Sequence, residues 1–423
     1  MSFEISKVVS REVIDCRGFP TPEVDIWVGG QFAARAMVPA GRSTGLREAA
    51  EIRDGGKRWG GQGVQKVVKS INEEIGPALI GRDVREQRAI DTFLCGLDGT
   101  KNKARLGANA VVGVSLGVTR AGAASMGLPL YRYINSNAHV IPVPLVNLIN
   151  GGKLTSNDLE IQEFIVMPVG ANNLLEGMQM CYEVNMVLKD MIVAKYGKIA
   201  VNVGDEGGFA PPMTGIDEPM EFLSTAVEKA GYANDMVYGY DAAASHWYDW
   251  DRGVYEFDGK EMDRDQVIDM YVKLCNDYPV GSIEDPLMED DFEGHAILVE
   301  KLDGVQIVGD DLFTTNLEYL KQGVEINSAN AILWKFNQVG TITEALDAAD
   351  YAYRSGYGVQ VSERSGETED TSIADLSVAL NCGQIKTGTT RSERTGKYNQ
   401  LIRIAEELGS EAVYPGRNFR KPY

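Results

Sequence analysis

The chain has 423 residues, of which 44% are hydrophobic, and it carries a formal net charge of −20 at neutral pH. This length suits one large barrel with a smaller second domain, or two to three domains of average size, and the composition supports a sizeable core. A surface this acidic repels the phosphate backbone, so nucleic acid is not an expected partner. No basic amphipathic segment indicates a membrane surface.

Cysteine and histidine usage narrows the class of protein further. The five cysteines are odd in number, widely spaced and free of any CxxC motif, which indicates reduced thiols in a cytoplasmic protein. The segment MSFEISKVVSREV lacks a basic stretch followed by an apolar run, so no signal peptide is expected. No two of the three histidines have zinc-ligand spacing, which argues against a zinc hydrolase.

The first part of the chain predicts strands followed by helices. Residues 4–15 and 22–37 alternate apolar and polar side chains around a turn, which is typical of strands. A Gly- and Pro-containing loop follows at 39–45. Helices are predicted at 47–53, 63–79 and 107–127, and polar residues interrupt the last one too often for a membrane span. We therefore expect a small α+β domain over residues 1–138.

From residue 139 onward the pattern changes. Short apolar runs that end in charged residues alternate with amphipathic helical segments, with most runs about 25 residues apart. The runs are EFIVMP, AVNVGDEGG, VYGYDAAA, VGSIEDP, VQIVGDDL, AILWKFNQ, GVQVSERSG and QIKTGT. Eight such runs predict a (β/α)8-type barrel over residues 139–423, giving an α/β protein.

Charged residues follow these runs at the positions that face an active site in such barrels. They are Glu206, Asp241, Glu284, Asp310, Lys335 and Arg364. Converging carboxylates repel one another unless a cation lies among them, and hard oxygen ligands suit Mg²⁺. A single acidic residue at a strand end can merely cap a helix, but this alternative does not account for the whole set. A metal with a neutral lysine can remove a weakly acidic proton beside a carboxylate.

The chain resembles the enolase family over nearly all its length. Long motifs occur in the family's order, including VPAGRSTG, LDGTKNKARLGANAVVGVSL, IQEFIVMPVGA, NVGDEGGFAP, SIEDP, QIVGDDLFTTN, RSGETEDT, QIKTG and RSERTGKYNQLIRIAEELG. The resemblance implies a barrel preceded by a smaller domain, a small phosphorylated carboxylate as substrate, and a homodimer or a multiple of dimers. The lysine–magnesium pairing is itself the known pattern of enolase-superfamily sites.

The resemblance also implies roles for individual residues. Asp241, Glu284 and Asp310 would bind one Mg²⁺, and Ser43 would help to bind a second. Lys335 would be the base, Glu206 the general acid, and Glu163 would assist near that acid. The remaining implied contacts to substrate come from Gln162, Arg364, Ser365 and Lys397, with Lys397 expected at the substrate carboxylate.

Three departures from the family pattern affect this picture. The family's SHAGN is KLTSN here, so Leu154 replaces a histidine, and VSHRSGE is VSERSGE, so Glu363 replaces another. Arg42 is added beside Ser43.

We place all three at the substrate and expect a changed reaction on a 2-phosphoglycerate- or phosphoenolpyruvate-like acid. The specific prediction is a carboxyphosphonoenolpyruvate synthase, transferring a phosphonoformyl group in phosphonate or phosphinate biosynthesis. The alternatives are an ordinary enolase of glycolysis and a non-catalytic binding protein with this fold.

Overall fold

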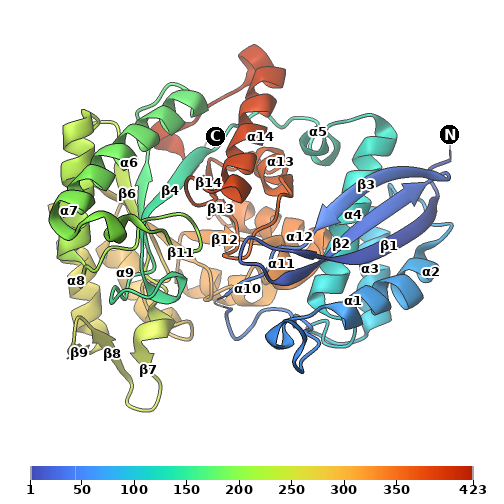
Figure 1. Cartoon of the computed structure of the whole chain (residues 1–423), viewed down its shortest axis with the longest axis horizontal. Helices are drawn as coiled ribbons and strands as arrows, with labels where there is room; N and C mark the ends of the chain where they lie inside the picture. The colour runs from blue at the N-terminus through green and yellow to red at the C-terminus, as the bar shows by residue number, and fades with distance from the viewer. Residues whose placement is uncertain (1, 43, 422–423) are drawn as a thin grey trace.

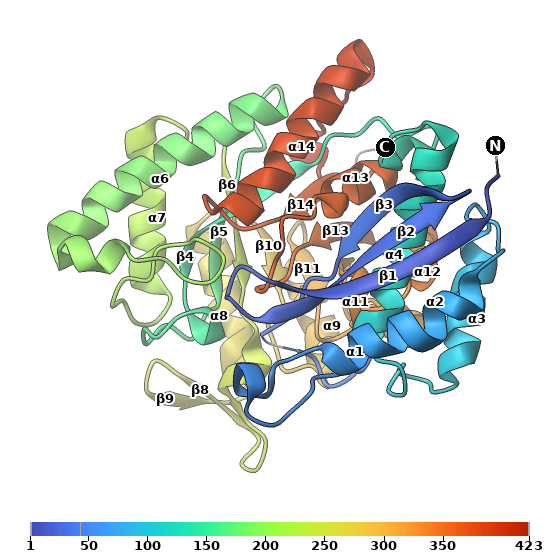
Figure 2. The same ribbon diagram turned by 45° about the vertical axis from the view of Figure 1, so that its right-hand side comes forward.

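The computed structural model describes residues 2–42 and 44–421. A small sheet with its helices lies beside a larger barrel, and the two parts are in contact along one side of the barrel (Figures 1 and 2). The predicted domain boundary at 138/139 falls in the segment between helix α5 and strand β4. No helix in the described ranges combines the length and apolar character that crossing a membrane requires.

The small sheet is antiparallel, with strand order β1-β2-β3. Its strands are β1 (Ile5–Ile14), β2 (Pro20–Val28) and β3 (Gln31–Met37). The single strand predicted over 22–37 is therefore wrong. Gly29 and Gly30 break it, since both have positive φ, at 57° and 84°, and form a two-residue hairpin turn.

Helix α4 packs on this sheet with almost no exposed surface along its first four turns. A Cβ on Gly113 would lie 2.9 Å from Val38, and one on Gly117 would lie 3.1 Å from Ile26, so the two glycines allow the close approach. The helices of this part are α1 (Gln65–Ser70), α2 (Gly76–Leu79), α3 (Gln87–Asp98), α4 (Ala108–Met126) and α5 (Leu130–Ile134), with a π-helical stretch at Ile71–Ile75 and a 3-10 turn at Arg58–Gly61.

The helix predicted at 47–53 does not form. Ala49 donates its backbone N–H to Gln338, and Ala50 donates to Asn102. The carbonyl of Ala50 in turn accepts from Ala108. Because neighbouring segments satisfy these backbone groups, this stretch is a connector that ties the small domain to the barrel.

Within the described residues, eight strands close into a barrel in the order β4-β5-β6-β10-β11-β12-β13-β14. They are β4 (Val143–Asn150), β5 (Glu163–Met167), β6 (Val237–Asp241), β10 (Val280–Glu284), β11 (Gln306–Gly309), β12 (Ala331–Trp334), β13 (Gly358–Ser362) and β14 (Gln384–Lys386). The (β/α)8-type prediction is confirmed with one variation, since β5 runs antiparallel to both neighbours. The β4–β5 connection contains only a 3-10 turn at Gly152–Leu154, which is too short for a parallel crossover.

The run AVNVGDEGG is not a barrel strand. It holds a 3-10 turn at Lys198–Val201 and one isolated bridge between Val203 and Phe209. Glu206 therefore lies on a tight turn in the loop between α6 and α7, not at the end of a strand.

Helices surround the barrel, and most begin with a side-chain cap. Asn173, Asp291, Asn316 and Thr341 each accept a backbone N–H of the first turn, and Asp263 forms a capping box with Gln266. The helices are α6 (Leu174–Tyr196), α7 (Asp217–Ala230), α8 (Arg264–Asp277), α9 (Phe292–Lys301), α10 (Leu317–Ile326), α11 (Phe336–Val339), α12 (Ile342–Arg354), α13 (Ser372–Ala379) and α14 (Ser392–Leu408). A small three-stranded sheet, β7 (Tyr248–Asp249), β8 (Val254–Phe257) and β9 (Lys260–Met262), projects from one end (Figure 1).

Candidate active site

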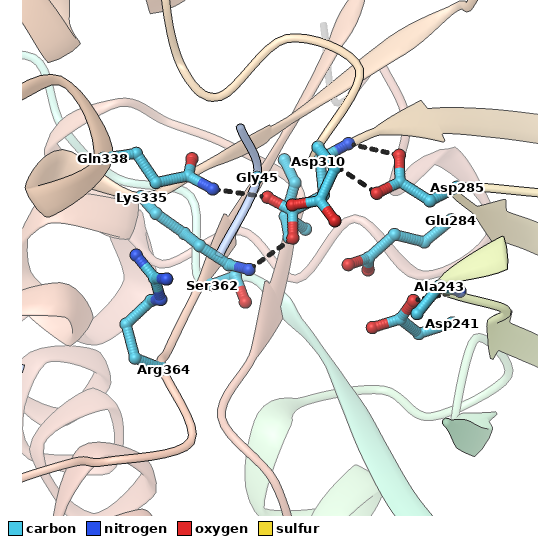
Figure 3. A network of polar contacts seen from close by, with 12 residues as sticks. Gly45, Asp241, Ala243, Glu284, Asp285, Asp310, Lys335, Gln338, Ser362 and Arg364 are labelled. Atoms are coloured by element: carbon cyan, nitrogen blue, oxygen red, sulfur yellow. Dashed lines mark hydrogen bonds and ion pairs between the residues drawn. The ribbon is translucent and has the colours of Figure 1, made fainter. Parts of the chain in front are cut away.

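Three carboxylates converge at the carboxyl ends of neighbouring barrel strands. Asp241 is the last residue of β6, Glu284 is the last of β10, and Asp310 directly follows β11. All three are buried. Figure 3 shows their side chains pointing toward one space, as expected for parallel strands that end at the same rim.

Asp310 is held in position from both sides. Its carboxylate accepts from Lys335 Nζ at 2.6 Å and from Gln338 Nε2 at 2.7 Å (Figure 3). The backbone N–H groups of Asp310 and Asp311 donate to the carboxylate of Asp285 at 2.9 and 2.7 Å. Burial lowers the pKa of Lys335, but the Asp310 charge outweighs it, so this pKa lies above its ordinary value. A lysine must be neutral to act as a base, whereas this arrangement favours the charged form of Lys335.

A second lysine, Lys386, lies among the carboxylates. It ends strand β14, and its ammonium contacts Glu284 at 2.6 Å, Glu163 at 3.0 Å and Asp241 at 3.3 Å. Burial opposes its charge, but these carboxylates raise the pKa of Lys386 well above its ordinary value. Lys386 therefore offsets the charge of Glu163, Asp241 and Glu284, as Lys335 offsets that of Asp310.

Lys397 does not belong to this cluster, and its placement at the substrate carboxylate is wrong. Its ammonium pairs with Glu367 at 2.9 Å and donates to the carbonyl of Thr368 at 2.7 Å, buried on helix α14. Sequence reasoning chose the wrong lysine, although Lys386 ends the last apolar run of the barrel pattern. Its place at a strand end was the signal that identifies it.

The oxygen atoms around this space fit a magnesium ion. Glu284 Oε1, Glu163 Oε2, Gln162 Oε1 and Asn147 Oδ1 are buried and have no hydrogen-bond partner among the described residues. Burial and neighbouring carboxylates raise the pKa of Glu163 and of Glu284 well above the ordinary value, although Lys386 opposes the rise. Unpaired hard oxygen donors in an acidic cluster are the ligand set that Mg²⁺ prefers.

Glu163, the first residue of strand β5, and Gln162, directly before it, lie beside the cluster. Gln162 donates from Nε2 to the carboxylate of Asp241 at 3.0 Å, and its backbone N–H donates to the Asp241 carbonyl at 2.9 Å. Glu163 pairs directly with Asp241 in the β5–β6 ladder. Because β5 is antiparallel to its neighbours, its first residue lies at the rim where a parallel strand would place its last residue. Glu163 and the preceding Gln162 therefore both reach the rim.

Glu206, in the turn of the loop between α6 and α7, lies at the same rim. Its carboxylate accepts from Asn147 Nδ2 at 3.1 Å and is buried. Burial and the nearby charge of Glu363 raise the pKa of Glu206 to about 7. A carboxyl group that keeps its proton near neutral pH can serve as a general acid.

Arg364 and Ser365 form a cationic and polar end to the site. Arg364 makes a two-bond contact with Glu48 of the small domain, at 2.9 and 3.0 Å, and donates to Asn337 at 3.1 Å. Figure 3 shows the Arg364 side chain beside Lys335. Ser365 Oγ accepts the backbone N–H of Arg42 at 2.7 Å. The small domain thus helps to shape this cationic end of the site.

Described residues of the loop at 39–45 contact this end. Ala40 and Gly366 exchange backbone hydrogen bonds at 2.9 Å each, and the Arg42 guanidinium pairs with Asp205 at 3.0 Å. Ser43, the predicted ligand of a second Mg²⁺, lies outside the described residues. A cavity of about 510 Å³ opens under the loop, and its charged lining consists of Arg17, Arg42, Glu48, Glu51, Arg53 and Arg364.

The two replaced histidine positions are both buried. Leu154 is the last residue of its 3-10 turn and is 3% exposed. Glu363 forms an ion pair with Arg394 of helix α14, and both side chains are almost fully enclosed. Burial raises the pKa of Glu363 to about 7, although Arg394 opposes this rise. The charge of Glu363 is therefore offset by a counterion from the chain itself.

A closed barrel with this carboxylate–lysine rim and a smaller amino-terminal domain defines a lyase of the enolase superfamily. Two family models match: "Enolase, N-terminal domain" over residues 5–134 and "Enolase, C-terminal TIM barrel domain" over residues 138–423. The chain is 55% identical over 423 residues to the enolase of Methanocaldococcus jannaschii. It is 54% identical over 426 residues to the enolases of Thermococcus gammatolerans and Pyrococcus furiosus. Each comparison covers 100% of this chain and 99% of the relative, so the chain belongs to the enolase family.

The prediction of a carboxyphosphonoenolpyruvate synthase in phosphonate biosynthesis is wrong. Relatives that are 50–55% identical over the full chain carry the name Enolase, which favours the alternative of an ordinary enolase. The structure supplies a physical reason. The charge of Glu363 is compensated by Arg394, and Arg42 is engaged by Asp205, so neither substitution leaves a new unpaired charge in the site.

Proposed function

We propose that the protein interconverts 2-phosphoglycerate and phosphoenolpyruvate plus water in a magnesium-dependent reaction. The observation that supports this proposal best is the rim of Asp241, Glu284 and Asp310, with Lys335 bonded to Asp310 and the buried carboxyl group of Glu206 near Glu163. A base and an acid on different elements suit a reaction that removes a proton from one carbon and hydroxide from the next.

In this proposal, different residues of the chain transfer protons and bind the substrate. Lys335 accepts the proton from C2, and Glu206 donates its proton to the hydroxyl leaving C3, so that water departs and a C2–C3 double bond forms. Arg364 and Ser365 bind the phosphoryl group, and Lys386 attracts the substrate carboxylate. Glu163 and Gln162 orient the groups around them.

Asp241, Glu284 and Asp310 would hold one Mg²⁺ in this proposal, and Ser43 would contribute to a second. A magnesium ion held there would supply positive charge that offsets the Asp310 carboxylate beside Lys335, and it would stabilise negative charge on the substrate carboxylate. We also propose a homodimer or a multiple of dimers in the cytoplasm and two domains that meet at 138/139.

The test is a steady-state assay of 2-phosphoglycerate dehydration, followed by the ultraviolet absorbance of the enol product. The purified protein should be active with Mg²⁺ and inactive after chelation. Lys335→Ala should lose turnover and the exchange of the C2 proton with deuterated solvent, while 2-phosphoglycerate still binds. A wild-type protein without dehydratase activity under these conditions contradicts the proposal.

A further inference from the structure

Arg394 is a buried arginine that the proposed reaction does not use. It lies in the first turn of α14, and its side chain is 0% exposed. An arginine is rarely enclosed so completely unless its guanidinium donors are all engaged. Its contacts therefore indicate what it is for.

The guanidinium of Arg394 joins two segments of the active-site rim. One nitrogen pairs with Glu363 and donates to the carbonyl of Arg364 at 2.7 Å. The other terminal nitrogen, Nη2, donates to the carbonyls of Ser365 at 2.8 Å and Asp205 at 3.0 Å. The first segment, 363–365, carries the anion-binding residues, and the second, 205–206, carries the proposed acid.

The packing around Gly388 shows independently how closely these segments meet. A Cβ at Gly388 would lie 2.5 Å from the carbonyl oxygen of Glu206, 2.8 Å from Glu363 Oε1 and 3.3 Å from Arg394 Cδ. The backbone N–H of Thr389 donates to the same Glu206 carbonyl at 3.0 Å. Residues 388 and 389, which follow β14, therefore pack against both segments. Arg394 contacts the two segments at the same place.

Glu363 completes the arrangement. Glu363 Oε2 pairs with Arg394, whereas Glu363 Oε1 has no hydrogen-bond partner among the described residues. The charge of Glu363 balances the buried guanidinium, while the three carbonyl contacts give the guanidinium its position. Removing the arginine alone would leave a buried carboxylate without a partner, which is strongly destabilising.

We propose that Arg394 is a positioning residue that keeps the anion-binding segment 363–365 and the acid-bearing segment 205–206 in register, with Glu363 as its fixed counterion. The kinetic part of this inference rests on the proposed dehydratase function, whereas the structural part does not. A 1 Å misplacement of reacting groups costs about 100-fold in rate, so the loss of this register should be large.

The experiment uses the full-length protein and the double variant Arg394→Met/Glu363→Gln, which removes both charges together and so avoids a lone buried carboxylate. Arg394→Lys is the conservative variant, since it can pair with Glu363 but cannot reach three carbonyls at once. Lys103→Met is the matched control: Lys103 is also buried and pairs with Glu344 at 2.6 Å, but it contacts neither segment.

The first readout is hydrogen exchange of backbone amides in the two segments, which does not depend on activity. In the double variant, exchange should become at least 10-fold faster in both segments at once, and Lys103→Met should leave both unchanged. Unchanged exchange in the double variant, or faster exchange in one segment alone, overturns the inference. If the wild type does not dehydrate 2-phosphoglycerate, the proposed function fails, and this readout still decides the role of Arg394.

The second readout separates positioning from a general loss of folded protein. A merely structural role lowers the active fraction and therefore the apparent kcat, with KM unchanged. Displaced binding and acid segments should instead raise KM for 2-phosphoglycerate about 10-fold and lower kcat about 100-fold. Arg394→Lys should show the same direction of change with near-normal stability. Wild-type kcat and KM in Arg394→Lys contradict the positioning role.

Discussion

Replacing Lys386 with methionine tests which lysine belongs to the acidic cluster. The ammonium of Lys386 contacts three buried carboxylates, Glu284, Glu163 and Asp241, at 2.6 to 3.3 Å. Methionine keeps most of the side-chain volume and removes the charge, which leaves the carboxylates without their partner. Breaking a buried ion pair in this way costs about 3–5 kcal/mol, so we expect that loss in the free energy of unfolding without magnesium.

Magnesium should reverse part of this effect. A divalent cation bound to the same carboxylates supplies the missing positive charge, so saturating Mg²⁺ should reduce the difference between variant and wild type by about half or more. The assay is denaturant unfolding of both proteins in chelator and in Mg²⁺. Turnover of 2-phosphoglycerate by Lys386→Met should be lost in either condition.

Lys397→Met is the matched control for this prediction. Lys397 is equally buried, but it pairs with Glu367 outside the cluster. Its loss of stability should be the same in chelator and in Mg²⁺. The reasoning is refuted if Lys386→Met is as stable as the wild type in chelator, or if magnesium rescues Lys397→Met instead.

The remaining predictions concern the metal, the acid and the anion end. Asp310→Asn should abolish tight Mg²⁺ binding, measured by calorimetry, and unchanged affinity would remove the metal assignment. Glu206→Gln should lower kcat about 10²–10⁴-fold. The raised pKa of Glu206, about 7, means that its contribution to stability is present below its unfolded pKa and is lost as pH rises toward 7. Glu206→Gln should therefore flatten the fall of unfolding free energy between about pH 4.5 and 7, and an unaltered slope would contradict the shift. Arg364→Lys should raise KM for 2-phosphoglycerate at least 10-fold, since lysine cannot reproduce the two-bond contact with Glu48, and an unchanged KM would exclude Arg364 as the anion anchor.

Much of the site was predictable because residues at strand ends need no knowledge of distant partners. In a closed parallel barrel, every strand end faces the same rim, so Asp241, Glu284, Asp310 and Lys335 could be placed together from the spacing of apolar runs alone. The same rule pointed to Lys386, and the prediction failed only where a motif resemblance was assigned to Lys397 instead.

Other errors arose where local sequence does not decide local structure. The segment 47–53 has helix-forming residues, but its backbone groups bind Gln338, Asn102 and Ala108. The direction of β5 follows from the short link after β4, and the place of Glu206 follows from a turn, not from a strand. In each case contacts made after folding override the local preference.

The sequence by itself determined the fold class, the family and most of the charged residues at the barrel rim, because these depend on periodicity and on motifs that are continuous in the chain. Only the tertiary structure decided what Glu363 does. Its counterion, Arg394, lies 31 residues further along on another helix, and no local pattern connects the two. A buried charge is defined by its surroundings, so the same glutamate that would repel an anion in isolation is a neutralised part of the scaffold once the helix packs against it.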